Sequence, residues 1–333
     1  MSALAWVVGR GGLLGSCVER ALGAAAWRPE RPLAWSEPER RAPSIAEAVR
    51  GFTARLAATP ADGWILCWCA GAGVVGSPAS ELEAETASLR LLLERLGAAL
   101  DEDPRTRTLP GRVFAASSAG GVYGGSPERP LNEASAPRPI SEYGRAKLEQ
   151  EEAVAAWAAA RPRVSTLVGR LANIYGPGQR LDKPQGLISH MSRCLIHGVP
   201  VHVYVPLDTI RDYLFAEDAG RRVAAGLARI GCEAPGGGRH VTKVYASERE
   251  TTVAGLIGVF RRIAKRELRV VSGLHPVRAQ QPARLQFRSA VWRDEPEGPR
   301  TELLDGVSRV HRHQLALFQA GRLPAPPLPG PPR

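Results

Sequence analysis

Tyr143 and Lys147 are the two residues whose types and spacing most directly suggest chemistry. They lie four apart in the run Ser141-Glu-Tyr-Gly-Arg-Ala-Lys147, and on a helix such side chains project from one face. An ammonium close to a phenol favours the phenolate, so the phenol can give or take a proton during chemistry on a carbinol or ketone. A solvated helix face produces the same spacing by chance, so the assignment needs support from other motifs.

A glycine-rich turn near the amino terminus gives the first support. Leu4-Ala-Trp-Val-Val8 predicts a short buried strand, which runs directly into Gly9-Arg-Gly-Gly-Leu-Leu-Gly15 and then a helical pattern. The glycines at 9, 12 and 15 allow a tight turn, the approach of a pyrophosphate to the helix N-terminus, and close packing of helix on strand. We therefore predict a dinucleotide site, the alternative being a turn that only packs.

A hydroxyl at the end of a later strand gives the second support. Arg112-Val-Phe-Ala-Ala116 predicts a strand that ends in Ser117-Ser118-Ala-Gly-Gly-Val-Tyr-Gly124. Ligands of parallel sheets bind beyond the carboxyl ends of the strands. Ser118 is therefore placed at the edge where we expect Tyr143.

Together these segments resemble the extended branch of the short-chain dehydrogenase/reductase superfamily, which includes nucleotide-sugar epimerases, dehydratases and reductases. Gly169-Arg-Leu-Ala-Asn-Ile-Tyr-Gly-Pro-Gly178 resembles the branch's R-x-x-N-x-Y-G-P segment, and Ile210-Arg-Asp-Tyr-Leu-Phe-Ala-Glu-Asp218 resembles its R-D-Y/F-x-x-x-x-D segment. The resemblance covers most of the chain. It implies an α/β fold, a doubly wound parallel Rossmann sheet with a smaller C-terminal substrate-binding lobe.

The predicted elements agree with that architecture. Strands are expected near 4–8, 32–35, 64–69, 112–116 and 164–169, and helices near 13–23, 44–58, 79–100 and 142–160. We expect an NADP-binding Rossmann domain over 1–173 plus 211–233, a lobe over 174–210 and 234–321, and a Pro-rich disordered tail over 322–333.

Bulk composition narrows the function classes. The 333 residues are 44% hydrophobic without an apolar run near ~20 residues or a basic-then-apolar leader, so we expect a soluble cytoplasmic protein without a membrane partner. The net charge of +11 would suit nucleic acid, but the arginines are scattered rather than interleaved with aromatics, and we predict no nucleic acid partner. The cysteines and histidines show no ligand spacing, so no metal is predicted.

The predicted second strand, 32–35, decides the expected cofactor. It ends in Ser36 with Arg40 and Arg41 following, and Arg10 lies in the glycine turn; hydroxyl and guanidinium groups suit a 2′-phosphate, so we predict NADP(H). Glu37 could instead supply the carboxylate typical of NAD enzymes. The resemblance implies further cofactor contacts from Gly9, Gly12, Leu13, Leu14, Gly15, Cys69, Ala70, Gly71, Tyr143, Lys147 and Ala172.

The resemblance also implies the reaction. We predict that NADPH reduces a ketone at C4 of a dTDP- or UDP-linked keto-deoxysugar, with Tyr143 as proton donor. Lys147 would stabilise the phenolate form of Tyr143 and bind the nicotinamide ribose. Ser118 would donate a hydrogen bond to the carbonyl oxygen. Counted back from Val122-Tyr123-Gly124 the usual hydroxyl position falls on Ala119, and Ser117 is a weaker alternative. The Asp-Glu pair of the dehydratases is missing, because the chain reads Ala119-Gly120-Gly121 there.

Substrate contacts and assembly follow from the same resemblance. Asn173 and Arg211 match diphosphate contacts, Leu187, Ile188 and Val203 lie where the base is held, and Arg278 is a second basic contact. The helix over 79–100 and the Tyr143 helix are expected to form a homodimer's four-helix interface. Glu85 departs from the family, which commonly has asparagine there.

Three other functions stay open on the sequence. An NAD-retaining nucleotide-sugar 4-epimerase needs the same tyrosine and lysine and no extra carboxylates. A non-catalytic NADP-binding sensor would need neither residue. A ketoreductase acting on an aglycone or polyketide is disfavoured by the diphosphate contacts expected at Asn173 and Arg211.

Overall fold

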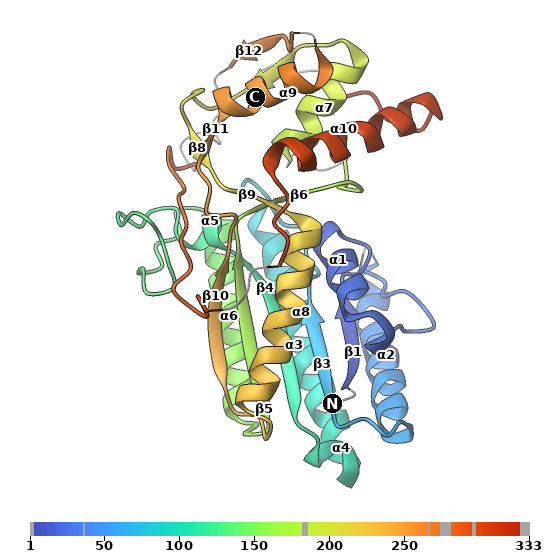
Figure 1. Ribbon diagram of the computed structural model, residues 1–333. Helices are drawn as coiled ribbons and strands as arrows, with labels where there is room; N and C mark the ends of the chain where they lie inside the picture. Colours follow the sequence, from blue (N-terminus) through green and yellow to red (C-terminus); the bar gives the residue numbers. More distant parts are fainter. Residues whose placement is uncertain are drawn as a thin grey trace.

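A parallel six-stranded sheet forms the centre of the molecule (Figure 1). The computed structural model describes residues 3–35, 37–181, 186–265, 267–273, 281–294 and 298–326. In spatial order the sheet runs β10-β5-β4-β3-β1-β2, and every neighbouring pair is parallel. Its strands are β1 (Ala3–Val8), β2 (Ala26–Trp27), β3 (Gly63–Trp68), β4 (Gly111–Ser118), β5 (Val164–Leu171) and β10 (His240–Tyr245).

Helices cover both faces of this sheet, which confirms the predicted doubly wound α/β fold. On one face α1 (Leu13–Leu22) packs against α8 (Ala216–Glu233). On the other, α3 (Ala79–Glu102) lies between α2 (Pro38–Ala58) and α6 (Glu142–Ala159). Because both faces are covered, every residue of β3 and β5 is buried, including the polar Ser165, Thr166 and Arg170 of β5.

Two sheet strands differ from the prediction. The second strand is β2, not residues 32–35, because Trp27 packs edge-on against Trp6 of β1 and contacts Phe52 of α2. The edge strand β10 pairs with β5 from His240 to Tyr245, so this segment belongs to the Rossmann sheet rather than to the lobe. The helix predicted from residue 44 begins at Pro38, a residue suited to the first turn because its missing N–H has no helical partner there.

A smaller lobe lies beyond the carboxyl ends of the strands (Figure 1). Its separate hydrophobic core is built by α7 (Leu187–His197), β7 (Val201–Val203), α9 (Val253–Ala264) and α10 (Leu303–Gln319), and β12 (Val270–Ser272) pairs with β7. Two short pairs lie between lobe and sheet, β6 (Asn173–Tyr175) with β9 (Tyr213–Phe215) and β8 (Ile210–Arg211) with β11 (Thr251–Thr252).

The remaining elements are short. They are η1 (Gly23–Ala25), α4 (Pro104–Thr108) and α5 (Ala119–Val122), the last directly after β4. Within the described part of the chain, no helix is long and apolar enough to cross a membrane. Most of the tail predicted to be disordered, residues 327–333, lies outside the described residues.

Candidate active site

Tyr143 and Lys147 lie on α6, whose start is fixed by its cap. Ser141 Oγ accepts a hydrogen bond of 3.2 Å from Gly144 N, which begins the helix at Glu142 and puts Tyr143 in its first turn. Lys147 follows one turn later and is buried. Its Nζ lies 5.8 Å from the centroid of the Tyr143 ring, so the two predicted catalytic groups are brought together.

The Tyr143 ring lies between two glycine-bearing segments at the carboxyl edge of the sheet. A Cβ on Gly121 of α5 would lie 3.1 Å from Tyr143 Cε1, and one on Gly73, after β3, would lie 3.8 Å from Tyr143 Cδ2. At Gly73 a Cβ would also lie 2.4 Å from Leu82 Cδ2. The missing side chains therefore make room for the ring and for the helix that carries Leu82.

Ser118 is the better placed of the two serines that end β4. Its Oγ caps α5 by accepting a hydrogen bond of 3.1 Å from Gly121 N, and Gly121 lies next to the Tyr143 ring. Ser117 is buried, and its hydroxyl donates to Glu151 on α6. Ser118 therefore shares a neighbour with Tyr143, while the hydroxyl of Ser117 is bound elsewhere.

A largely buried carboxylate from another helix pairs with Lys147. Glu85 Oε1 of α3 accepts from Lys147 Nζ at 2.9 Å, and the two side chains are 10% and 9% exposed. Lys147 Nζ also donates to Gln150 Oε1 at 2.9 Å. Residue types alone could not identify this pair, because its members lie 62 positions apart.

A second buried ion pair lies one turn further along α6. Arg170 of β5 donates to Glu151 through Nε at 3.0 Å and through Nη2 at 2.7 Å. Arg170 Nη1 also donates to the hydroxyl of Tyr123, and Ser117 completes the group through Glu151. This network joins β4, β5, α6 and the C-cap residue of α5, one turn of α6 beyond Lys147.

The glycine turn meets the end of β3 by backbone contact. Gly9 has φ +88°, and a Cβ there would lie 2.5 Å from Ala70 N; one on Gly15 would lie 2.2 Å from Gly9 O. Gly12 is the N-cap of α1 and makes no side-chain capping bond. The turn therefore leaves helix N–H groups for an anion, and it brings Gly9 against the backbone of Cys69 and Ala70; Gly71 lies instead beside the Glu85 carboxylate.

The other implied cofactor residues flank this turn. Leu13 and Leu14 open α1, where Leu14 is buried, and Ala172, which follows β5, is buried too. They occupy the carboxyl edge of the sheet together with the turn.

The residues predicted to select the cofactor are placed differently, because the second strand is β2. Ser36 lies outside the described residues. Arg40 pairs with Glu37 at 2.8 Å, and Arg41 donates to the carbonyl oxygen of Trp35. Neither arginine directly follows β2, the second strand of the sheet along the chain.

Two other arginines converge at the end of β2. Arg28 directly follows the strand and donates to both oxygens of Glu19, at 3.0 Å each, and Arg10 Nε donates to Glu19 Oε1 at 2.8 Å. Burial raises the pKa of Glu19, but hydrogen bonds from Arg28 and Arg10 hold it below its ordinary value. The sequence pointed to Arg10 but missed Arg28, whose only signal is its position after a two-residue strand.

The predicted substrate residues divide into two groups. Arg211 is buried and donates to the carbonyl oxygens of Ile210 and Pro282 and to Gln281 Oε1; burial lowers the pKa of its guanidinium. Asn173 is exposed, and its backbone N–H bonds to Asp212 O beside Arg211. These two lie together between sheet and lobe.

The second group belongs to the lobe. Ile188 and Val203 are buried in the lobe core, and the half-buried Leu187 packs against it. Arg278 lies outside the described residues. In addition, no group of three His, Cys, Asp or Glu side chains that could hold a metal occurs among the residues described.

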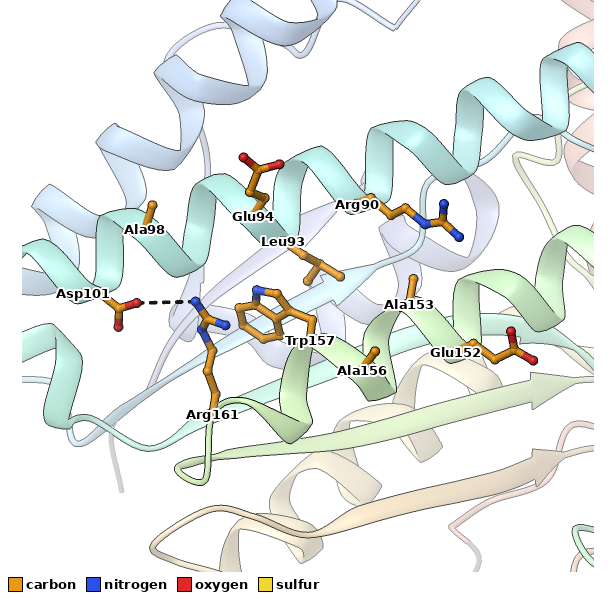
Figure 2. A pocket seen from close by; sticks show the side chains of 10 residues that line it. All are labelled: Arg90, Leu93, Glu94, Ala98, Asp101, Glu152, Ala153, Ala156, Trp157 and Arg161. Atoms are coloured by element: carbon orange, nitrogen blue, oxygen red, sulfur yellow. Dashed lines mark hydrogen bonds and ion pairs between the residues drawn. The ribbon is translucent and has the colours of Figure 1, made fainter.

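A surface groove of about 740 Å³ separates the later halves of α3 and α6 (Figure 2). Arg161 stacks on the Trp157 ring, 4.6 Å from its centroid, and bonds to Asp101 at 3.4 Å. None of the predicted catalytic, cofactor or substrate residues lines the groove. Its lining residues are Arg90, Leu93, Glu94, Ala98, Asp101, Glu152, Ala153, Ala156, Trp157 and Arg161.

Comparison with known proteins gives a family match and several relatives. The model of the NAD dependent epimerase/dehydratase family matches residues 67–231. A dTDP-L-rhamnose 4-epimerase of Burkholderia thailandensis is 35% identical over 94 residues, 28% of this chain and 26% of the relative. A dTDP-4-dehydro-6-deoxyglucose reductase of Escherichia coli is 31% identical over 107 residues, 32% of this chain and 33% of the relative. The matches thus span about a third or less of these relatives' lengths.

The fold is shared much more widely than the sequence. The structure of RMD from Pseudomonas aeruginosa complexed with NADPH superposes with a TM-score of 0.72 over 94% of this chain and 98% of that chain, at 22% sequence identity. At this identity the likeness shows the fold alone.

Proposed function

Because this chain belongs to the extended short-chain dehydrogenase/reductase superfamily, we propose that it is an NADPH-dependent reductase of a ketone at C4 of a dTDP- or UDP-linked keto-deoxysugar. One observation carries the choice of reductase: Arg10 and Arg28 converge at the end of β2. Guanidinium groups there suit a 2′-phosphate, and a reductase consumes NADPH at each turnover. Solved structures of this fold hold NADPH or NAD, so the likeness favours a nicotinamide dinucleotide, and the choice between the two rests on the arginines.

The residues at the carboxyl edge fit a dinucleotide. The uncapped N-terminus of α1 offers backbone N–H groups to a pyrophosphate, and a side chain at Gly9 or Gly15 would close the approach. When bound, the reduced nicotinamide supplies the hydride that adds to the carbonyl carbon. Lys147, whose Nζ lies 5.8 Å from the centroid of the Tyr143 ring, would bind the ribose of the same cofactor.

The chain's own groups then manage the proton. As the carbonyl oxygen gains charge, Ser118 Oγ donates a hydrogen bond to it and the Tyr143 hydroxyl gives it a proton. The O–H bond of the new alcohol forms as the phenol O–H bond breaks. The Lys147 ammonium stabilises the resulting phenolate, which takes its proton back from solvent.

Arg211 supports a nucleotide-linked substrate. It is a buried guanidinium whose hydrogen bonds, among the described residues, go to neutral oxygens. A diphosphate there would gain charge-assisted bonds of about 1.5–3 kcal/mol each. We therefore expect Arg211→Ala to raise KM for the nucleotide sugar about 10–100-fold with a smaller change in kcat.

The cofactor is tested by fluorescence titration of NADPH and NADH into purified protein. We expect clear preference for NADPH, and Arg10→Ala and Arg28→Ala to weaken NADPH about tenfold or more while leaving NADH unchanged. Arg55→Ala, an exposed arginine at the far end of α2, is the control. Arg40→Ala and Arg41→Ala test the prediction from the sequence that these two arginines contact the 2′-phosphate. Equal affinity for both cofactors would contradict the proposal.

An NAD-retaining nucleotide-sugar 4-epimerase is the second candidate. A 4-epimerase is among the relatives, and the same tyrosine and lysine serve both reactions. A dinucleotide that stays bound in stoichiometric amount through gel filtration would favour this candidate, since a reductase must release the oxidised cofactor. Under the reductase proposal we expect the protein to elute without it.

The groove between α3 and α6 supports a further proposal, that the chain forms a homodimer through these helices. It is lined by the half-buried Trp157 ring and the exposed Ala156 among charged side chains of both signs (Figure 2). Light scattering should give twice the chain mass. Ala156→Arg, a change at an exposed position of the groove, should give the monomer, and a wild-type monomer would contradict the proposal.

A further inference from the structure

Glu85 accepts hydrogen bonds from two segments of the chain, α6 and the loop after β3. Its Oε1 accepts from Lys147 Nζ at 2.9 Å and from Gln150 Nε2 at 3.2 Å, both on α6. Its Oε2 accepts from the backbone N–H groups of Ala72 at 3.1 Å and Gly73 at 3.2 Å. The carboxylate thus ties Lys147 to the loop after β3, beside the Tyr143 ring.

The charges of this pair depend on each other. Burial lowers the pKa of Lys147, but the Glu85 carboxylate outweighs it and raises the pKa above its ordinary value. Burial raises the pKa of Glu85, yet Lys147 and the hydrogen bonds from Gly73 and Gln150 hold it below the usual range. A buried lysine without such a partner loses its proton at much lower pH.

Other titratable groups around Lys147 do not replace Glu85. Within the described part of the chain, those that act on it are Glu85, Tyr143 and Cys69, which follows β3. Burial raises the pKa of the Cys69 thiol to about 12, so it stays neutral at physiological pH. Glu85 is therefore the anion on which the charge of Lys147 depends.

We propose that Glu85 is a positioning residue that keeps Lys147 charged and fixed beside Tyr143 through neutral and mildly alkaline pH. This role rests on the proposed function, in which Tyr143 transfers the proton. Lys147 makes two hydrogen bonds among the described residues, to Glu85 and Gln150, which leaves its third N–H for a ligand. Glu85 thus holds the ammonium without using up all its donors.

The test follows the lysine directly. The chain has four lysines, 147, 183, 243 and 265, so NMR of ¹³C-labelled lysine gives few signals, and Lys147→Met assigns one. In Glu85→Gln we expect Lys147 to titrate roughly two pH units lower than in the wild type. Glu81→Gln, which removes an exposed carboxylate one turn earlier on α3, should change nothing. An unchanged Lys147 titration in Glu85→Gln would overturn the proposal.

Two further variants separate charge from packing. Glu85→Asp keeps the charge and should leave the lysine titration near that of the wild type; a shift as large as that of Glu85→Gln would overturn the proposal. Glu85→Asn is a second neutral variant that decides the question if Glu85→Gln does not fold.

Turnover supplies the functional readout. The alkaline limb of the pH profile of kcat should move down by at least one pH unit in Glu85→Gln, with KM for NADPH changing less than threefold. The NMR titration needs neither cofactor nor substrate, so it decides the role of Glu85 even if the reductase proposal fails. If Lys147 titrates at lower pH in Glu85→Gln but the protein binds no NADPH, the proposed role of Glu85 stands and only the reductase proposal is overturned.

Discussion

Two buried ion pairs lie one turn apart on α6 and differ in what surrounds them. Glu151 and Arg170 belong to a closed network, in which Ser117 and Tyr123 supply the remaining contacts. Lys147 and Glu85 form a pair of similar burial, but Lys147 keeps an N–H for a ligand and lies beside the Tyr143 ring.

One helix thus combines a pair that supports the fold with a pair that serves the proposed chemistry. The Glu151 pair connects β4, β5 and α6 under the sheet edge, so we expect its loss to weaken the fold. The Lys147 pair places one charge beside the proposed proton donor, so its loss should act on pH dependence as well as stability. The predictions below test this division.

Glu151→Ala should have the largest effect on stability. It leaves the Arg170 guanidinium buried without its anion, and breaking such a pair costs about 3–5 kcal/mol of unfolding free energy. Urea denaturation measures the loss, with Glu149→Ala, an exposed carboxylate on the same helix, as the control. A loss below about 1 kcal/mol would mean that the network does not support the sheet edge.

Lys147→Met should cost about 3 kcal/mol at neutral pH, because Glu85 loses its cation while it stays buried. The pKa of Glu85 is lowered in the folded wild type, so its contribution to stability is present above the unfolded value of 4.5 and is lost as pH falls. The difference between wild type and variant should therefore shrink below about pH 4.5. Denaturation at several pH values measures it; a constant difference would argue against the ion pair.

Asp212 is a buried carboxylate that, among the described residues, accepts hydrogen bonds from neutral donors rather than from a cation. Burial raises its pKa from 3.8 to about 6, although Ser247 N donates to Oδ1 at 2.7 Å. The folded state then binds more protons than the unfolded state between about pH 4 and 6, so this group's contribution to stability falls by about 2 kcal/mol over that range as pH rises. Asp212→Asn should abolish that decline, which thermal unfolding at stepped pH will show. If the slope of stability against pH is unchanged in Asp212→Asn, a group other than Asp212 titrates in this range.

Ser117→Ala should have the smallest effect, about 1 kcal/mol of unfolding free energy, because it removes one hydrogen bond to Glu151. We expect kcat to change little. Ser118→Ala, its neighbour, should instead lower kcat. The reverse result would make Ser117 the hydroxyl that contacts the carbonyl.

Much of the sheet could be predicted from the sequence. Strands β1 and β3 are continuous apolar runs, β4 and β5 contain shorter ones, and the predicted bounds of all four lie within two residues of those observed. The second strand could not be predicted, since two residues show no periodicity and the nearby apolar run at 32–35 was the stronger local signal. Pairing with β5 places β10 in the sheet, and that contact between distant segments leaves no local trace.

The candidate site shows the same limit. The spacing of Tyr143 and Lys147 follows from one helix, and the structure brings them together as predicted. The partners of Lys147 and Arg10 could not be foreseen, because Glu85 and Arg28 reach them only through folding. Local periodicity therefore predicts which face a residue occupies, but not which charge lies opposite.

The carboxylate between Arg10 and Arg28 has a consequence for redesign. Glu19 is buried on α1 and holds both arginines at the end of β2. Replacing only the arginines to change the cofactor would leave Glu19 as a buried, uncompensated anion, at a cost in stability. An engineer should therefore exchange positions 10, 19 and 28 together.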